Sequence, residues 1–570
     1  MKSLTCDETP RPTLYAETMP GDPALKARSL PFSQIPHTTR LFLDFLEHAP
    51  AAREFYPRDL QFGEWLKEEA SAVRYDATRR AQVCAILDRQ NKSWDAPPQT
   101  LANLDRLRKG AVAVVTGQQV GLFGGPAFCI FKALTAVKLA QQAAAAGVDT
   151  VPVFWLATYD HDLAEVNHVS LPGPDGALQT LTTSSHGIAG APVSTVRFGD
   201  EISPLVEQAA ALLGESKTGE NQATTWLRES YRPGETLGTA FARLYTRMFA
   251  EWGVIVLDAS DPELHRVALP VYQAAIERAD ELDAALLVRG QALEAAGYHQ
   301  QVKVTASSVL VFALKDGART AVHQRNTGGK QEFVVGDASA KGLSSQELTA
   351  QIVAEPERFS PNVLLRPVVQ DYLLPTLAYV GGAAEIAYFA QAGAIYEKLA
   401  GRVTPVLPRF SATVIESKTH RVMEKKSISL PDAFGGPEAL RRQLAARSLP
   451  SDLLSAFEAA SKSLAAHMAV LQEKIAVLDQ TLVDAAQTAA SKTQYQLEKL
   501  QAQAARAEAL KSEVIGRCAE SLSHALYPNK GLQERSVAAI YFVARYGPEF
   551  LRQIYDAIQP DCNDHQILEL

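Results

Sequence analysis

Apolar runs of strand length and helical patterns alternate in the middle of the chain. Residues 111–115 and 151–157 are apolar and short, and residues 127–146 between them repeat apolar side chains at helical spacing. Strand, helix and strand in this order predict a βαβ unit, hence an α/β fold with a parallel sheet whose ligands bind at the carboxyl ends of the strands. Further candidate strands are Trp252–Asp258, Leu377–Val380 and Val403–Leu407.

Two segments interrupt this core. Residues 170–200 are rich in Gly, Pro, Ser and Thr and predict an inserted β-rich lobe. Residues 301–335 contain short alternating runs around the turn Lys315-Asp316-Gly317, which predicts a second inserted β segment. Residues 1–110 are typical of a helical lead-in.

Residues 451–515 contain neither Gly nor Pro. Apolar side chains recur there at alternating spacings of four and three, at Leu464, Met468, Leu471, Ile475, Leu478, Leu482, Ala485 and Ala489. This pattern predicts a coiled-coil seam, with an ordinary core helix as the alternative. The register slips between Ala489 and Leu497, and a single helix would be about 95 Å long, so we expect an antiparallel hairpin.

Composition limits the class of protein. The chain has 570 residues, a formal net charge of −8 and no basic field, so nucleic acid is not expected as a partner. The five cysteines form no Cys-x-x-Cys pair and indicate free thiols in a reducing cytosol. The first residues lack an apolar signal core, and no apolar run is long enough to span a bilayer. We therefore expect a cytoplasmic protein of two or more domains, with no membrane contact.

The stretch TGQQVGLFGGP, residues 116–126, joins the first strand to its helix. Backbone N–H groups and the positive end of a helix dipole meet at such a loop, which favours an anion. Candidate ligands for a phosphate or carboxylate are Gly117, Gln118, Gln119, Gly124 and Gly125. Packing alone can also require such glycines, and the loop matches neither a Walker A motif nor Gly-x-Gly-x-x-Gly.

The second strand ends in a group of acids and histidines. Asp160, His161, Asp162, Glu165 and His168 lie within nine residues. If a helix begins near Asp162, Glu165 and His168 share one face. The group could do acid–base work, bind a metal–nucleotide or orient an amine, with Asp160, His161 and Asp162 as candidates for taking the amine proton or positioning Mg²⁺. The structural alternative is that Asp162 only caps the helix and His168 packs inside. The spacing matches no standard zinc-ligand pattern, so no metal site is assigned.

Residues 364–391 repeat the logic of strand, glycines and helix. Arg366 and Asp371 lie among apolar residues, so we expect them to pair with each other or with a ligand. Gly381, Gly382 and Glu385 follow the candidate strand and are further binding candidates, with a tight turn and a salt bridge as the alternative. Near the end of the chain, PNKGLQERS supplies Lys530 and Arg535 as phosphate contacts, or is a solvated connection.

Three blocks together, TGQQVGLFGGP, FWLATYDHDLAEVNH and LRPVVQDYLLPTLAYVGGAAEIAYFAQ, resemble the cysteine-adding enzymes of bacillithiol biosynthesis, the BshC family. The resemblance implies a Rossmann-like core with two connecting-peptide insertions, and a coiled coil that joins two subunits into a homodimer. We accordingly expect a core over 1–440 with insertions at about 170–240 and 290–345, a coiled-coil domain over 445–520, and a C-terminal helical segment over 521–570 that returns to the core.

The chain departs from the family pattern at two places. Gly381-Gly382-Ala383-Ala384-Glu385 stands where typical members have Gly-Gly-Pro-Ala-Glu, and Asp479-Gln480 stands where members tend to have Asp-Pro. The resemblance places the hairpin turn near Asp479, earlier than the register slip of this chain.

The reaction implied by the resemblance is addition of L-cysteine to the amine of glucosaminyl malate. A carboxylate and an amine do not condense spontaneously in water, so we expect activation by ATP, with Mg²⁺ as a candidate; a preactivated cysteine is the alternative. In this scheme Arg366 binds a carboxylate. Two other functions stay open: a nucleotidyltransferase-like enzyme on another substrate, and a nucleotide-sensing coiled-coil scaffold.

Overall fold

The computed structural model describes residues 25–570, except 186, 215–220, 328–329, 338, 448 and 512. The chain divides into two compact units. The first contains the residues up to 173, residues 178–412 and residues 534–567, and the second contains residues 174–177, 413–533 and 568–570.

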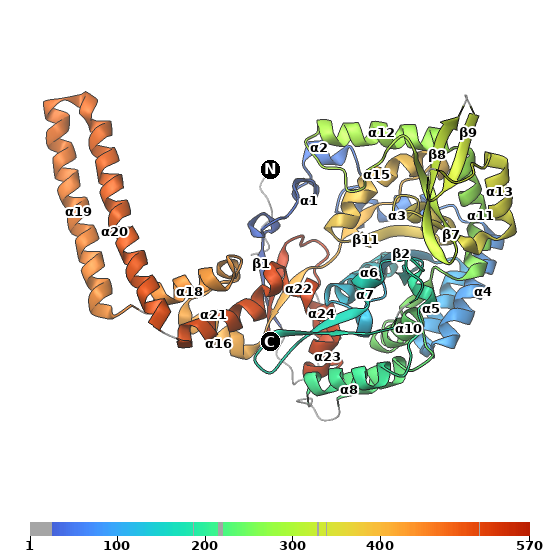
Figure 1. Ribbon diagram of the computed structural model, residues 1–570, viewed down its shortest axis with the longest axis horizontal. Coiled ribbons are helices and arrows are strands. Elements are labelled where there is room, and N and C mark those ends of the chain that lie inside the picture. The colour runs from blue at the N-terminus through green and yellow to red at the C-terminus, as the bar shows by residue number, and fades with distance from the viewer. Residues whose placement is uncertain are drawn as a thin grey trace. The chain divides into compact units, whose positions relative to one another are not determined.

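A five-stranded parallel sheet lies at the centre of the first unit, in the order β12-β11-β2-β3-β6 (Figure 1). Its strands are β2 (Val112–Gln118), β3 (Thr150–Leu156), β6 (Ile255–Asp258), β11 (Thr376–Gly381) and β12 (Val406–Pro408). All seven residues of β3 are buried, so both faces of the sheet are covered. The predicted parallel sheet is confirmed, and each candidate strand lies within a few residues of its expected position.

Later strands of the sheet lie on both sides of β2. β3 and β6 follow on one side, whereas β11 and β12 lie on the other; Val115 pairs with Val153 on one side and with Tyr379 on the other. Helix α6 (Phe128–Ala145) follows β2, and α15 (Ala383–Leu399) follows β11. The carboxyl ends of β2 and β11 therefore flank the point where the strand order reverses, which is where open α/β sheets bind ligands.

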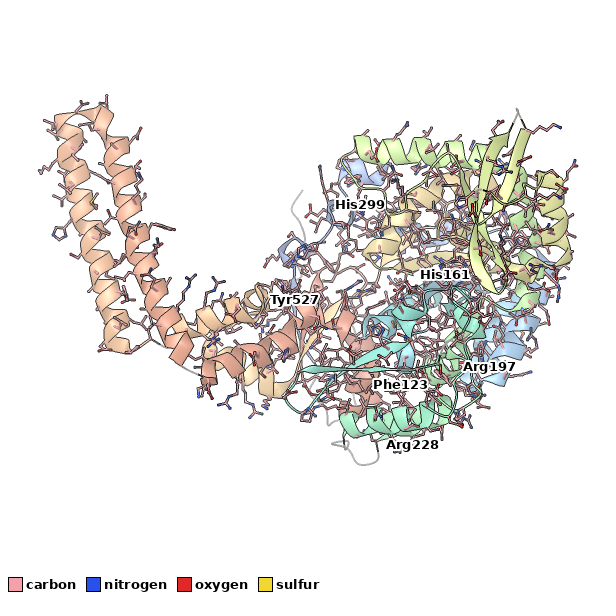
Figure 2. All side chains as sticks on the ribbon, in the orientation of Figure 1. Phe123, His161, Arg197, Arg228, His299 and Tyr527 are labelled. Carbon is pink, nitrogen blue, oxygen red and sulfur yellow. The ribbon has the colours of Figure 1, made fainter. Side chains whose placement is uncertain are left out.

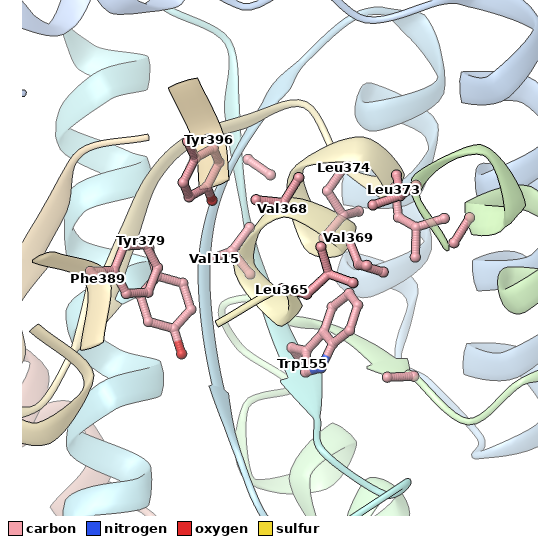
Figure 3. Close-up of a cluster of buried hydrophobic side chains, with 14 of the residues drawn as sticks. Val115, Trp155, Leu365, Val368, Val369, Leu373, Leu374, Tyr379, Phe389 and Tyr396 are labelled. Carbon is pink, nitrogen blue, oxygen red and sulfur yellow. The ribbon is translucent and has the colours of Figure 1, made fainter. Parts of the chain in front are cut away.

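Large apolar side chains fill the space between the sheet and its helices. Figure 3 shows Val115 and Trp155 of neighbouring strands with Leu365, which precedes α14 (Arg366–Leu373), and with Val369 of that helix. These four side chains are at most 2% exposed. Burying residues of this size contributes about 1.5–3 kcal/mol each, which holds the strand ends in register.

The two insertions differ from each other. The first contains one hairpin, β4 (His168–Pro172) with β5 (Leu178–Thr182), followed by helices, so the predicted β-rich lobe is confirmed only for the hairpin. Its helices are α8 (Ile202–Leu213), α9 (Gln222–Ser230) and α10 (Leu237–Met248). The second is the antiparallel sheet β10-β7-β8-β9, as predicted. Its elements are β7 (Ser308–Lys315), β8 (Ala318–Thr327), β9 (Lys330–Val335), α13 (Ser345–Ala354) and β10 (Phe359–Pro361).

Helices also precede the core, as expected, and follow both insertions. Before the core lie β1 (Lys26–Leu30), α1 (Arg40–Leu46), α2 (Pro50–Arg53), α3 (Phe62–Ala72), α4 (Ala77–Ser93) and α5 (Pro98–Lys109). Between the insertions lie α11 (Pro262–Glu277) and α12 (Ala279–Ala295). Near the C-terminus lie α22 (Gln533–Ser536), α23 (Ala539–Tyr546), α24 (Glu549–Ala557) and β14 (His565–Glu569).

The second unit contains the predicted helical hairpin, α19 (Ser451–Leu478) and α20 (Val483–Lys511) (Figure 1). Asp479 ends α19 and caps the short turn to α20, because its side chain accepts the N–H of Thr481. The turn expected near Asp479 is confirmed, and the later turn suggested by the register slip is wrong. Other elements of this unit are β13 (Ala412–Ile415), whose first residue is counted with the first unit, α16 (Ser417–Lys426), α17 (Leu430–Ala433), α18 (Gly436–Ala446) and α21 (Glu513–Leu526).

Two sequence expectations concern the environment of the chain. Among the described residues, no helix has the length and apolar character needed to cross a bilayer. Cys84, Cys129 and Cys518 are free thiols, but Cys562 is in a disulfide. The expectation of free thiols throughout is therefore wrong at Cys562.

Candidate functional site

Side chains from two predicted blocks meet at the carboxyl edge of the sheet. Gln119, just after β2, donates its amide N–H to Asp160 Oδ2 at 2.9 Å and to Glu165 Oε2 at 2.7 Å. Asp160 follows β3, and its Oδ1 accepts the backbone N–H of His161 at 2.7 Å. One amide thus holds two carboxylates together beside a histidine, which is a group able to take up a proton.

The helix considered near Asp162 does begin there, but it is only one turn long. Helix α7 spans only Leu163–Val166, and His168 is the first residue of β4. Asp162 caps α7 by accepting the N–H of Glu165 at 3.2 Å, so the structural alternative holds for Asp162. The shared helical face of Glu165 and His168 is wrong, because the hairpin begins before a second helical turn can form.

Glu165 has the most informative charge environment of this group. Burial raises the pKa of its carboxyl above the ordinary value, and the nearby carboxylates Asp160 and Asp162 add to this. The Gln119 hydrogen bond and the Arg535 guanidinium act in the opposite direction. A carboxylate with a raised pKa is a stronger base, which suits removal of a proton from an amine.

Lys132 of α6 connects the first block to the third. Its ammonium donates to the carbonyl of Gly117, to Gln118 Oε1 at 3.2 Å and to Glu385 Oε2 at 2.6 Å. Its side chain is 1% exposed. Three donors meet three acceptors, so the buried charge is satisfied.

Glu385 is the counter-charge of Lys132. Its carboxylate also accepts the hydroxyl of Tyr379 at 2.6 Å and the N–H of Gly382 at 2.8 Å. Burial alone would raise the pKa of Glu385, but Lys132 and these hydrogen bonds hold it below the ordinary value. Gly381 and Gly382 therefore form the turn that places Glu385, as the structural alternative predicted.

Arg366 and Asp371 do not form the direct pair that we considered. Arg366 donates to Gln370 at 2.9 Å and to the hydroxyl of Tyr388 at 2.9 Å, and Gln370 donates to Asp371 at 3.0 Å. Asp371 is surrounded by the polar groups of Thr376, Thr404 and Arg402, at the amino end of β11. It therefore lies at the end of β11 opposite Gly381, Gly382 and Glu385, because a six-residue strand is about 20 Å long.

The glycine loop is packed inside the protein. Gly124 donates its N–H to the Tyr231 hydroxyl at 3.1 Å and accepts the Tyr245 hydroxyl at 3.1 Å. Gly125 is also buried, and its N–H bonds to the carbonyl of Leu122 at 3.1 Å. Phe123 adopts a left-handed φ of 51°. These contacts favour the packing alternative for Gly124 and Gly125, and leave Gln118 and Gln119 as the polar part of the loop.

Replacing Gly124 by Val is expected to destabilise the first unit. Its φ of +91° costs a branched residue about 1–2 kcal/mol, and the new Cβ would lie 3.0 Å from Leu244 Cδ2. Gly147→Val is the matched control, because φ is +87° there but no atom lies within 4 Å of the new Cβ. A larger fall in Tm for Gly124→Val supports the packing role; equal falls contradict it.

Two basic side chains of the first unit, Arg409 and Arg535, lie beside the start of α6, and they differ in their partners and exposure. Arg409 forms an ion pair with the fully buried Glu534. Arg535 is exposed, and its guanidinium lies 5.7 Å from the centre of the Phe128 ring at the start of α6. Lys530 is an exposed residue of the second unit, on the short turn Pro528–Lys530. Of Arg409 and Arg535, Arg535 is therefore the side chain open to an anionic ligand.

Sequence reasoning missed two residues of this site. Arg319 of β8 approaches Asp160 Oδ1 at 3.7 Å, and no spacing in the sequence connects the second insertion with β3. Lys132 left a signal, since it is a lone charge in the apolar stretch FCIFKALTAV, where a buried charge requires a partner. Among the residues that the structure describes, no three His, Cys, Asp or Glu side chains form a metal-binding group.

The fold and the site define a Rossmann-like α/β protein with a coiled-coil hairpin, in which acids and a histidine gather at the carboxyl ends of β2 and β3, beside the strand-order reversal. The model of the BshC N-terminal Rossmann-like domain of bacillithiol biosynthesis matches residues 26–410, and that of the C-terminal coiled-coil domain matches residues 412–570. The chain belongs to the BshC family of bacillithiol biosynthesis, as the sequence blocks predicted.

Relatives match this chain over nearly its whole length. Two proteins named "Putative cysteine ligase BshC", from Koribacter versatilis and Solibacter usitatus, are 47% and 37% identical to it, over 95% and 94% of this chain and 99% and 98% of their own. A protein of the same name from Salinibacter ruber is 30% identical over 96% of this chain and its own full length.

Proposed function

We propose that this protein is a ligase that joins L-cysteine to the sugar amine of glucosaminyl malate through an amide bond. One observation carries the proposal beyond family membership. Gln119 holds Asp160 and Glu165 together at the carboxyl edge of the sheet, beside the point where the strand order reverses. That is the edge at which this type of sheet binds substrates, and the group there can accept an amine proton.

Each side chain has a role in this scheme. Asp160 and Glu165 take the proton from the attacking amine, and Gln118 with Gln119 orients the reacting groups. Arg535 pairs with an anionic group of a substrate, since its guanidinium is exposed beside α6. Arg366 has a supporting role and does not bind a substrate carboxylate with its two terminal nitrogens, because both already donate to protein atoms.

The test of the proposed function is thiol profiling of a strain that lacks this protein. We expect loss of bacillithiol and accumulation of glucosaminyl malate, with recovery when the wild-type chain is returned. A strain with normal bacillithiol, or one without the accumulated precursor, would contradict the assignment. Accumulation of a different precursor would instead favour a related enzyme with another acceptor.

ATP is the proposed source of activation. It would supply the activated cysteine carboxylate, which does not form spontaneously in water. Arg535 and the start of α6 fit a phosphate chemically, and Lys530 is kept as a second candidate.

Calorimetric titration with ATP and ADP, with and without Mg²⁺, is expected to give binding of roughly 4–8 kcal/mol, corresponding to millimolar to micromolar Kd. We expect Arg535→Ala to weaken binding more than Lys530→Ala does. No heat at millimolar nucleotide would contradict ATP dependence and favour a preactivated cysteine, while leaving the family assignment unchanged.

The coiled-coil hairpin is the proposed dimer interface. Its apolar side chains stay open to solvent in the single chain: Leu471 is 51% exposed, Leu478 80% and Val477 86%. A second copy of the hairpin would cover them and remove apolar area from water.

Replacing both Leu471 and Leu478 by Lys is expected to convert a dimer into monomers with little change in Tm, because both positions are exposed within one chain. Light scattering measures the mass. Lys462→Leu on the same helix is the control, because it changes a side chain of that helix without adding charge to the interface. A monomeric wild-type protein contradicts the proposed interface, as does a dimer that survives the double substitution.

A further inference from the structure

Arg319 is held in one orientation beside the strand-end group. Its side chain is 7% exposed and its guanidinium lies 3.8 Å over the ring of Phe312. Nε donates to Ser360 Oγ at 2.9 Å, and Nη2 donates to the carbonyl of Pro361 at 2.8 Å. The remaining nitrogen, Nη1, therefore has a fixed direction, and it lies 3.1 Å from Nδ1 of His161.

This contact defines which nitrogen of His161 carries the ring hydrogen. A guanidinium has only donors, so Nδ1 accepts and the hydrogen of the neutral ring is on Nε2. A hydrogen on Nδ1 could point to Asp160 Oδ1 at 3.5 Å, but two N–H groups would then face each other at 3.1 Å. Arg319 cannot turn away, because Ser360 and Pro361 hold its other nitrogens.

The backbone around His161 is fixed as well. The carbonyl of Asp160 accepts the N–H of Val193 at 2.7 Å, and that of Thr158 accepts the N–H of Ser194 at 2.8 Å. The first insertion therefore clamps the main chain, while the second supplies Arg319. The His161 side chain itself is 40% exposed and can be reached by a substrate (Figure 2).

We propose that His161 acts as a hydrogen-bond donor, through Nε2, to an oxygen of a substrate carboxylate or carbonyl, and that Arg319 is the positioning residue that sets this tautomer. Removal of the amine proton is then left to Asp160 and Glu165. The inference rests on the proposed ligase function, but it changes the role that the sequence suggested for His161, which was uptake of the amine proton or positioning of Mg²⁺.

Two amide substitutions separate donor from base. The side-chain amide of Gln can present an N–H near the place of Nε2, whereas that of Asn reaches only the place of Nδ1. We expect His161→Gln to stay within about tenfold of wild-type kcat/KM, and His161→Asn and His161→Ala to lose about 10²-fold or more, as for removal of one positioned donor. Equal losses for Gln and Ala would overturn the donor role.

A double-substitution cycle tests Arg319. In the wild-type background Arg319→Met frees the tautomer, so kcat is expected to fall about tenfold or more. In the His161→Gln background the amide has no tautomer to set, so the same substitution is expected to have little effect on kcat. Equal losses in both backgrounds would make Arg319 merely structural. A wild-type protein that forms no cysteinyl product fails the proposed function instead, which keeps the two failures distinct.

Discussion

Replacing Lys132 by Met is expected to cost the first unit about 3–5 kcal/mol of stability, because Glu385 would be left as a buried charge without its partner. The carbonyl of Gly117 and the amide oxygen of Gln118 would lose their donor at the same time. Thermal unfolding should show a large fall in Tm for Lys132→Met, and refolding yield should fall with it.

Two controls separate charge burial from the loss of a lysine. Lys138→Met alters the same helix, but Lys138 is only half-buried and donates to a carbonyl of Tyr555 at 3.3 Å, so its effect should be small. Lys132→Met combined with Glu385→Leu removes both charges and should recover much of the stability, since well-packed apolar pairs often replace buried ion pairs without loss. Similar Tm values for Lys132→Met and Lys138→Met would contradict the ion-pair account.

The elements that sequence predicted well are those whose signal is local. Residues 151–157 form a strand because the run is short, apolar and β-branched, and the fold buries every residue of β3. The hairpin helices were visible because no Gly or Pro interrupts them. Gln119 and Asp160 each follow a predicted strand of one parallel sheet, for which ligands were expected at the carboxyl ends, and the structure brings the two side chains together at that edge.

The features that sequence could not give depend on distant contacts. The packing of Gly124 is defined by Tyr231 and Tyr245, more than a hundred residues away. The spacing of Glu165 and His168 fits one face of a helix only if that helix continues to His168, whereas the hairpin pairing of β4 with β5 decides the conformation of His168. Arg319 reaches Asp160 through a register of inserted strands that no local pattern encodes.

Candidate residues from one sequence block differ in their positions in the structure. Asp371 and Glu385 were both predicted from one block, yet they lie at opposite ends of β11. The sequence block around β11 contains residues that pack the core and residues that could act in chemistry, because both kinds surround one strand. Geometry then assigns Glu385 to the ion pair with Lys132, and leaves Asp160 and Glu165 as the acids that face Gln119.

The largest expected effect on activity is that of Glu165. As the proposed base it must be ionised, so Glu165→Gln is expected to lower kcat by about 10²–10⁴-fold at little cost in Tm. Its raised pKa places the acid limb of the pH profile of kcat/KM above that of an ordinary carboxyl, and activity should fall as the pH drops through it. Product formation from cysteine and glucosaminyl malate is the measurement.

Two neighbours should move that acid limb in opposite directions. The charge of Asp162 raises the pKa of Glu165, so Asp162→Asn should shift the limb to lower pH; Arg535 lowers that pKa, so Arg535→Ala should shift the limb to higher pH. Salt should weaken both shifts, since exposed charges are screened. Shifts of the same sign, or a profile that ignores both substitutions, would show that Glu165 is not the group whose ionisation controls the reaction, and Asp160 would then be the base.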